Sequence, residues 1–143
     1  MTRVAGTVVD SSVLLDVFTE DPRWGPWSEQ QLVLAGSRGA LVLNAVVLAE
    51  ISPRFSRVEA LRESLPAMSR IEEVPLAASF LAGHAHAGYR RAGGSRAAIL
   101  PDFLIAAHAA VTGRALLTRD PQRVRTHIPG VALIAPDEIG SQR

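Results

Sequence analysis

The chain has 143 residues, no cysteine and a formal net charge of +1. A chain of this length fits one domain, residues 1–143, and buries roughly 68–70% of its unfolded surface without disulfides. The lack of cysteine excludes zinc–thiolate sites and thiol nucleophiles, and the lack of lysine excludes P-loop and Schiff-base chemistry.

Apolar runs alternate with helical stretches from one end of the chain to the other. Five runs have the character of strands: 6–10, 40–43, 70–74, 114–118 and 131–135. Helical stretches lie between them: 13–18, 24–36, 44–53, 57–65, 75–91, 101–113 and 121–126. Ser12 and Asn44 are expected helix caps, and Pro53 breaks the helix that Asn44 begins.

This alternation predicts an α/β fold, a three-layer α/β/α sandwich with a central parallel sheet. Right-handed crossovers then place the carboxyl ends of all the strands at one edge of the sheet. No stretch reaches about 18 uncharged apolar residues, so no membrane span is expected. Asp10 and Asp16 interrupt the N-terminal apolar run, which argues against a signal peptide, and the absence of cysteine agrees with a cytoplasmic location.

Four carboxylates are expected at that edge. Asp10 ends the first strand, Glu50 lies in the helix after the second, Asp102 opens an apolar helix and Asp120 follows the fourth strand. Like charges that converge need a counter-charge, and a divalent cation with oxygen ligands, Mg²⁺ or Mn²⁺, is the simplest one. Ligands of open α/β sheets bind at this edge.

Each acid also has a simpler structural interpretation. Asp102 and Asp120 stand where helix N-caps stand, and Asp10 suits a turn. Glu50 is surrounded by apolar residues, where a charge needs a partner. Capping is the better interpretation for any one of them, but four acids at corresponding places favour a shared site.

The remaining polar residues carry weaker signals. His108 lies in the apolar helix and is expected to be a core histidine with its hydrogen bonds satisfied. Arg90, Arg91 and Arg96 flank a glycine-rich loop, where they are either a solvated basic patch or contacts to a bound phosphate. A Ser–His–Asp triad has no Gly-x-Ser-x-Gly element to support it.

Four segments carry a family resemblance. The run Val8 to Leu15 resembles the opening of PIN domains, and Leu100 to Ala109 with Gly113 to Asp120 resembles their third and fourth motifs. Ile128 to Val131 resembles the closing strand. With Glu50 the match runs over nearly the whole chain and is closest to VapC-type toxins. Asn44 stands where these proteins often have Ser or Thr.

The resemblance implies the toxin of a type II toxin–antitoxin system, a Mg²⁺-dependent endoribonuclease that cleaves structured RNA. It implies a cognate VapB-type antitoxin and a homodimer. Asp10, Glu50, Asp102 and Asp120 match the family's acidic metal-binding residues, and Ser12 and Thr118 match its supporting hydroxyls. A metal-bound water and a metal-bound phosphate oxygen would suffice for hydrolysis, so no His or Lys base is required.

Two other functions compete with this one. A haloacid-dehalogenase-like phosphatase needs a second Asp at the position of Ser12, and a lysine that this chain lacks. A catalytically silent PIN-like scaffold that only binds a partner remains open. The segment Trp24 to Leu34, together with Leu61 and Leu65, is the expected docking groove for the antitoxin.

Overall fold

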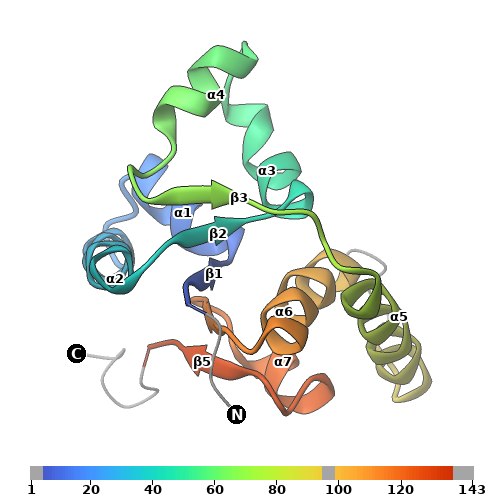
Figure 1. Cartoon of the computed structure of the whole chain (residues 1–143). Helices are drawn as coiled ribbons and strands as arrows, with labels where there is room; N and C mark the ends of the chain where they lie inside the picture. The colour runs from blue at the N-terminus through green and yellow to red at the C-terminus, as the bar shows by residue number, and fades with distance from the viewer. Residues whose placement is uncertain (1–4, 95–98, 137–143) are drawn as a thin grey trace.

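The protein forms a five-stranded parallel sheet with the strand order β3-β2-β1-β4-β5 (Figure 1). The structure, a computed structural model, describes residues 5–94 and 99–136. The strands are short: β1 Thr7–Val9, β2 Leu41–Leu43, β3 Ser69–Ile71, β4 Ala115–Leu117 and β5 Ala132–Ile134. The helices are α1 Ser11–Phe18, α2 Gly25–Arg38, α3 Ala45–Ile51, η1 Ser52–Arg54, α4 Val58–Ser64, α5 Leu76–Arg91, α6 Leu100–Thr112 and α7 Gln122–His127.

The strand order fixes the layers. From β1 the chain moves outward to β2 and β3, then returns across the sheet to β4 and β5. With right-handed crossovers, α1 to α4 cover one face and α5 to α7 cover the other. The three-layer sandwich predicted from the sequence is therefore confirmed. The direction of winding changes between β1 and β4, which creates the switch point where such sheets bind ligands.

The core fills both sides of this sheet. Val8, Val9, Leu43 and Leu117 are fully buried, and α6 contributes Phe103 to the same cluster. The apolar helix predicted to be buried is α6, and it packs on β1 and β4. It ends at Gly113, whose φ of 69° is left-handed and favours glycine.

The predicted elements all occur, with bounds that shift by a few residues. Asn44 caps α3 as expected, because its side-chain oxygen accepts hydrogen bonds from the backbone N–H groups of Val46 and Val47. The chain also changes at Pro53 as predicted, into η1. The prediction that Ser12 caps a helix beginning at Val13 is wrong: α1 begins at Ser11 with Asp10 as its N-cap, and the Ser12 hydroxyl donates to the Asp10 carboxylate.

A buried polar network joins β2, β3 and α6. The His108 ring lies 3.0 Å from the Asn44 amide and 3.3 Å from a Glu72 carboxylate oxygen. Arg114 donates two hydrogen bonds to Glu72, at 2.6 and 2.8 Å. His108 is fully buried and burial lowers its pKa, so the prediction of a satisfied core histidine is confirmed.

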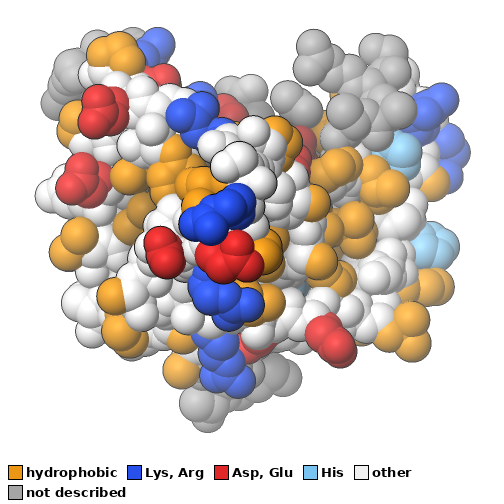
Figure 2. Space-filling model, turned by 90° about the horizontal axis from the view of Figure 1, so that it is seen from above, with side chains coloured by type: hydrophobic (Ala, Val, Ile, Leu, Met, Phe, Trp, Pro, Cys, Tyr) orange, Lys and Arg blue, Asp and Glu red, His pale blue; other side chains and the backbone are white. Residues whose placement is uncertain are grey.

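The outer surface carries exposed apolar side chains on α5, Leu76 and Phe80, and one on α4, Val58. Figure 2 shows arginine and acidic side chains interleaved down the centre of one face, with hydrophobic side chains and histidines gathered on its right. Among the described residues, no helix is long and apolar enough to cross a membrane.

Candidate active site

A cavity of about 250 Å³ opens at the switch point, beyond the carboxyl ends of β1 and β4. Among the described residues, its wall combines acidic, hydroxyl and apolar side chains with one arginine: Asp10, Ser11, Ser12, Leu15, Asp102, Ile105, Leu116, Arg119, Asp120 and Val124. Three of the four acids singled out in the sequence therefore line one cavity. They come from the β1 end, the first turn of α6 and the loop after β4.

Asp10 is the best-positioned carboxylate of this cavity. One of its oxygens, Oδ2, accepts hydrogen bonds from the hydroxyls of Ser12 at 2.9 Å and Thr118 at 2.8 Å. The same hydroxyls accept the backbone N–H groups of Arg119 and Asp120, at 3.3 and 3.1 Å. Ser12 and Thr118 therefore tie the loop after β4 to the end of β1 and fix the carboxylate between them.

The electrostatics of Asp10 favour its protonated form when nothing positive is bound. Burial is the largest cause and raises the pKa of its carboxyl, and the charge of Asp120 raises it further. The hydroxyl hydrogen bonds act in the opposite direction but do not reverse the shift. A buried carboxylate with a raised pKa at a strand end is typical of functional sites.

Glu50 adjoins the cavity and does not line it. It is exposed on α3, and its Oε1 accepts a hydrogen bond of 2.8 Å from the Ser11 hydroxyl. Ser11 itself lines the cavity, so this side chain connects Glu50 to the other acids. Burial and the charge of Asp10 raise the pKa of Glu50 against the effect of the Ser11 hydrogen bond.

Asp102 and Asp120 are not helix N-caps, as the simpler structural interpretation had them. The N-cap of α6 is Ile99 and that of α7 is Pro121. Asp102 lies in the first turn of α6, where the positive end of the helix dipole favours a carboxylate. The Asp120 side chain is 68% exposed at the mouth of the cavity.

The donor set fits a hard divalent cation. Oxygen ligands from carboxylates suit Mg²⁺ and Mn²⁺, and a bound cation would favour the ionised form of Asp10, whose pKa is raised chiefly by burial. Within the part of the chain that the structure describes, no group of three or more acidic or histidine side chains is close enough to hold a metal ion as it stands. The carboxylates share a cavity without forming a closed cage.

An ion pair beside the cavity was not anticipated from the sequence. Arg119 donates its Nε–H to Asp16 Oδ2 at 2.9 Å, and the Ser28 hydroxyl donates to the same oxygen at 2.9 Å. Asp16 is 3% exposed. In the sequence Asp16 only interrupts an apolar run, although an acid on the apolar face of a helix indicates that it has a buried partner.

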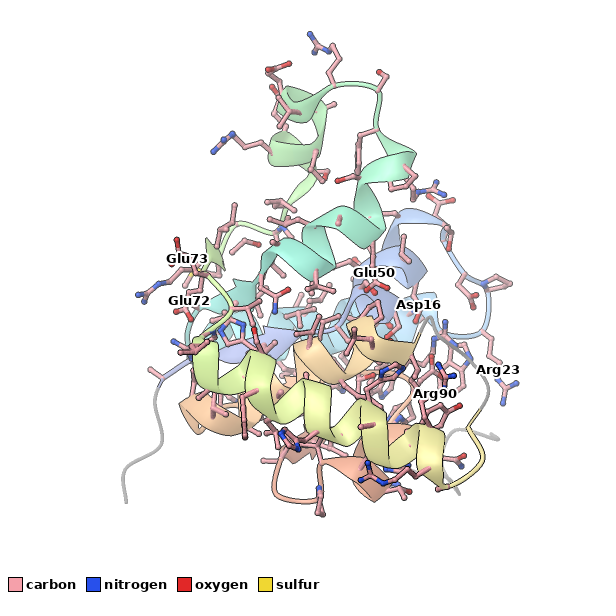
Figure 3. The ribbon with its side chains drawn as sticks, turned by 90° about the vertical axis from the view of Figure 1, so that its right-hand side faces the viewer. Asp16, Arg23, Glu50, Glu72, Glu73 and Arg90 are labelled. Atoms are coloured by element: carbon pink, nitrogen blue, oxygen red, sulfur yellow. The ribbon has the colours of Figure 1, made fainter. Side chains whose placement is uncertain are left out.

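Arg90 and Arg91, near the glycine-rich loop, are not part of this cavity wall. Arg90 and Arg91 are exposed in the last turn of α5. Arg96 falls outside the described residues. Figure 3 shows Arg90 on the same side of the view as Asp16, Arg23 and Glu50, with Glu72 and Glu73 on the other side. A role for Arg90 and Arg91 in RNA binding stays a prediction.

Solved structures with the same fold contain toxin–antitoxin proteins. A VapBC2 structure from Rickettsia felis, bound to a DNA fragment from their promoter, has a TM-score of 0.69 and 18% identity, covering 92% of this chain and 98% of that chain. DNA-bound VapBC from Salmonella typhimurium has a TM-score of 0.65 and 18% identity, with coverages of 92% and 98%. FitAcB from Neisseria gonorrhoeae has a TM-score of 0.64 and 18% identity, with coverages of 90% and 96%.

These identities show a shared fold and no more. No curated protein sequence matches the chain. The sequence model described as "PIN domain" matches residues 7–127, which include Asp10, Glu50, Asp102 and Asp120. Because this match covers most of its length, the chain belongs to the PIN domain family.

Proposed function

We propose that the protein is a Mg²⁺- or Mn²⁺-dependent endoribonuclease of the cytoplasm, the toxin of a type II toxin–antitoxin system. Nuclease activity is typical of PIN domains. The observation that supports it best is the cavity at the switch point, where Asp10, Asp102 and Asp120 meet and Asp10 has a raised pKa. Glu50 is the fourth acid of the proposed site and is joined to it by the hydrogen bond that the Ser11 hydroxyl donates.

In this proposal Asp10, Asp102 and Asp120 hold the metal, directly or through water, and Glu50 supports it. A bound divalent cation would activate a water and stabilise charge on the phosphate. The chain's own contribution is positioning. Ser12 and Thr118 fix the Asp10 carboxylate with two hydroxyl hydrogen bonds. The apolar wall of Leu15 and Ile105 limits the water in the cavity.

Metal-dependent cleavage of a structured RNA tests this proposal. Wild-type protein should cut the RNA with Mn²⁺ or Mg²⁺ and not with chelator, and Asp10→Asn and Asp102→Asn should abolish cleavage while circular dichroism stays unchanged. Glu59→Gln, which changes an exposed acid on α4, is the matched control and should cut normally. Cleavage by Asp102→Asn at the wild-type rate would overturn the assignment. A folded wild-type protein that never cuts would support the silent scaffold.

We further propose a VapB-type antitoxin as its partner, because the similar structures include VapBC complexes. Apolar surface is available on α2, where Val33 is 68% and Leu34 is 40% exposed. Val33 also lines an apolar cavity of about 400 Å³ with Leu41 and Met68.

Trp24 and Trp27, the expected anchors of this groove, are half-buried and packed edge to face against each other. A Trp27→Ala change would therefore disturb the fold as well as the surface. Val33→Glu is the sharper test in a pull-down with the product of the neighbouring gene, and Val111→Glu on α6 is a control of equal chemistry. Equal capture of both variants would place the antitoxin elsewhere.

The homodimer also remains a proposal. Leu76 and Phe80 are 88% and 68% exposed on α5 and give a second copy an apolar face to cover. Analytical ultracentrifugation of the purified protein measures the oligomeric state, and a monomer at micromolar concentration would contradict the proposal.

A further inference from the structure

Arg119 is the cationic member of the cavity wall. Its side chain is 28% exposed, and its neighbours in sequence are Thr118, which binds Asp10, and Asp120, which lines the cavity. Among the described residues, the hydrogen bonds of its guanidinium use Nε alone. Its terminal nitrogen Nη1 lies 3.8 Å from Asp120 Oδ1, which is longer than a hydrogen bond.

The guanidinium is held in place from behind. Asp16 is almost fully buried and accepts both the Arg119 Nε–H and the Ser28 hydroxyl through one oxygen. The Arg119 Cζ also lies 5.9 Å from the centre of the Trp24 ring, within the range of a cation–π contact. Burial lowers the pKa of Arg119, but the bond to Asp16 and the charges of nearby acids raise it overall, so the group is always charged.

Because Asp16 binds Nε–H, the N–H donors of the two terminal amino groups of Arg119 are available to a ligand. A guanidinium has five N–H donors in a planar fork, which suits two oxygens of one phosphate. A cavity lined by three carboxylates repels RNA, so a backbone phosphate needs a cation at the rim to approach it. Arg23, which stacks on the same indole with its Cζ 4.9 Å from the ring centre, adds a second positive charge on this side.

We propose that Arg119, held by Asp16, binds a backbone phosphate of the RNA substrate at the rim of the acidic cavity. Arg119 is thus a substrate-binding residue, and Asp16 is a positioning residue that acts through it. This inference rests on the proposed nuclease function, because it names a subsite of the same cavity. The competing interpretation is that the Arg119–Asp16 pair only stabilises the fold.

The salt dependence of RNA binding distinguishes the two interpretations. Binding of a short fluorescein-labelled oligouridylate is measured in chelator, without cleavage, between about 50 and 200 mM salt. Arg119→Gln should bind roughly tenfold more weakly, because a charged hydrogen bond is lost. Its slope of log K against log salt should be shallower by roughly 0.7, the value for one phosphate contact on a single strand.

Two variants serve as controls. Arg38→Gln removes an equal charge from the end of α2, just before β2 and therefore at the opposite edge of the sheet. It should keep the wild-type slope. Asp16→Asn keeps the Arg119 cation but weakens its anchor, so it should lower the affinity with little change of slope.

Equal slopes for Arg119→Gln and Arg38→Gln, with wild-type protein binding RNA, would overturn this inference and leave the nuclease function intact. If Arg119→Gln fails to fold because Asp16 is left unpaired, the double variant Asp16→Asn/Arg119→Gln removes both charges and gives the same slope test. A wild-type protein that shows no Mn²⁺-dependent cleavage in a parallel assay overturns the proposed function, and this inference with it.

Discussion

Replacing Asp10 by asparagine should stabilise the metal-free protein and remove its response to metal. The pKa of Asp10 is raised, chiefly by burial, so the folded protein binds this proton more tightly than the unfolded chain does. The ionised carboxylate therefore lowers the free energy of unfolding, starting near the unfolded pKa of about 3.9 and reaching its full effect above the folded pKa. Asparagine keeps a side-chain oxygen for Ser12 and Thr118 but carries no charge.

The size of the difference in Tm depends on pH in a way that identifies Asp10 as its source. At pH 7 in chelator, Asp10→Asn should melt above the wild-type protein, by about 2–4 °C for each kcal/mol gained. The difference in Tm should shrink as the pH falls through the folded pKa towards about 3.9, because wild-type Asp10 then takes up its proton. Using the difference between the two proteins cancels the titration of acids that do not interact with Asp10, which leaves Asp10 and its neighbours Asp120 and Glu50.

Metal should reverse the order of the two proteins. A cation that binds only the folded state at a hundredfold excess over its Kd adds about 2.7 kcal/mol, so the Tm of wild-type protein should rise by roughly 5–11 °C. Asp10→Asn should gain little. Differential scanning calorimetry with Mn²⁺ and with chelator measures both effects.

Asp21→Asn provides a control with the opposite sign. Asp21 accepts the backbone N–H groups of Arg23 and Trp24, which lower its pKa, so its loss should reduce Tm at pH 7. Its metal response should match that of the wild-type protein. If wild-type curves with Mn²⁺ and with chelator coincide, or if Asp10→Asn melts below wild-type in chelator, the reasoning about this cavity is refuted.

Three further predictions concern the scaffold and the RNA. Glu72→Gln should lower the free energy of unfolding by about 3 kcal/mol, the lower end of the range for a broken buried pair, because it leaves Arg114 without its carboxylate. The Arg114 hydrogen bond is the main cause of the lowered pKa of Glu72, so this stabilisation should be lost as the pH falls below about 4.3. Denaturant unfolding measures both effects. Asn44→Ala should lower the free energy of unfolding by roughly 2–4 kcal/mol, because the α3 cap and the contact with the buried His108 are lost together. Denaturant unfolding measures this loss. Changing Arg90 and Arg91 to Gln should weaken RNA binding and reduce the slope of log K against log salt by roughly 0.7 for each lost contact. An unchanged slope would mean that these two arginines are solvated and do not contact RNA.

The order of strands and helices was predictable because apolar runs and helix caps are local signals. Asn44 illustrates this, since its cap depends on residues two and three positions ahead. The parallel sheet followed from the alternation of elements. The strand order was not predictable from periodicity, because which strands pair depends on contacts between residues far apart in the chain.

The candidate site was predictable in its position but less so in its composition. Acids at strand ends indicated the cavity that Asp10, Asp102 and Asp120 line. The contact of Glu50 with this group through Ser11 was not predictable, because the two residues lie 39 positions apart in the chain. The Arg119–Asp16 pair joins residues 103 positions apart, so no local pattern identifies it.

The pairing of Arg119 with Asp16 also bears on the metal. Arg119 is the arginine of the cavity wall, and a single cation there would partly offset its three acids. Its nearest carboxylate is Asp16, which lies behind the wall at 2.9 Å, whereas Asp120 lies at 3.8 Å. Among the described residues, the hydrogen bond of Arg119 therefore goes to Asp16 and not to an acid of the cavity, and burial is the largest cause of the raised pKa of Asp10. This arrangement supports the proposed divalent cation, because Asp10 and Asp120 offer it carboxylate oxygens, the ligands that Mg²⁺ and Mn²⁺ prefer.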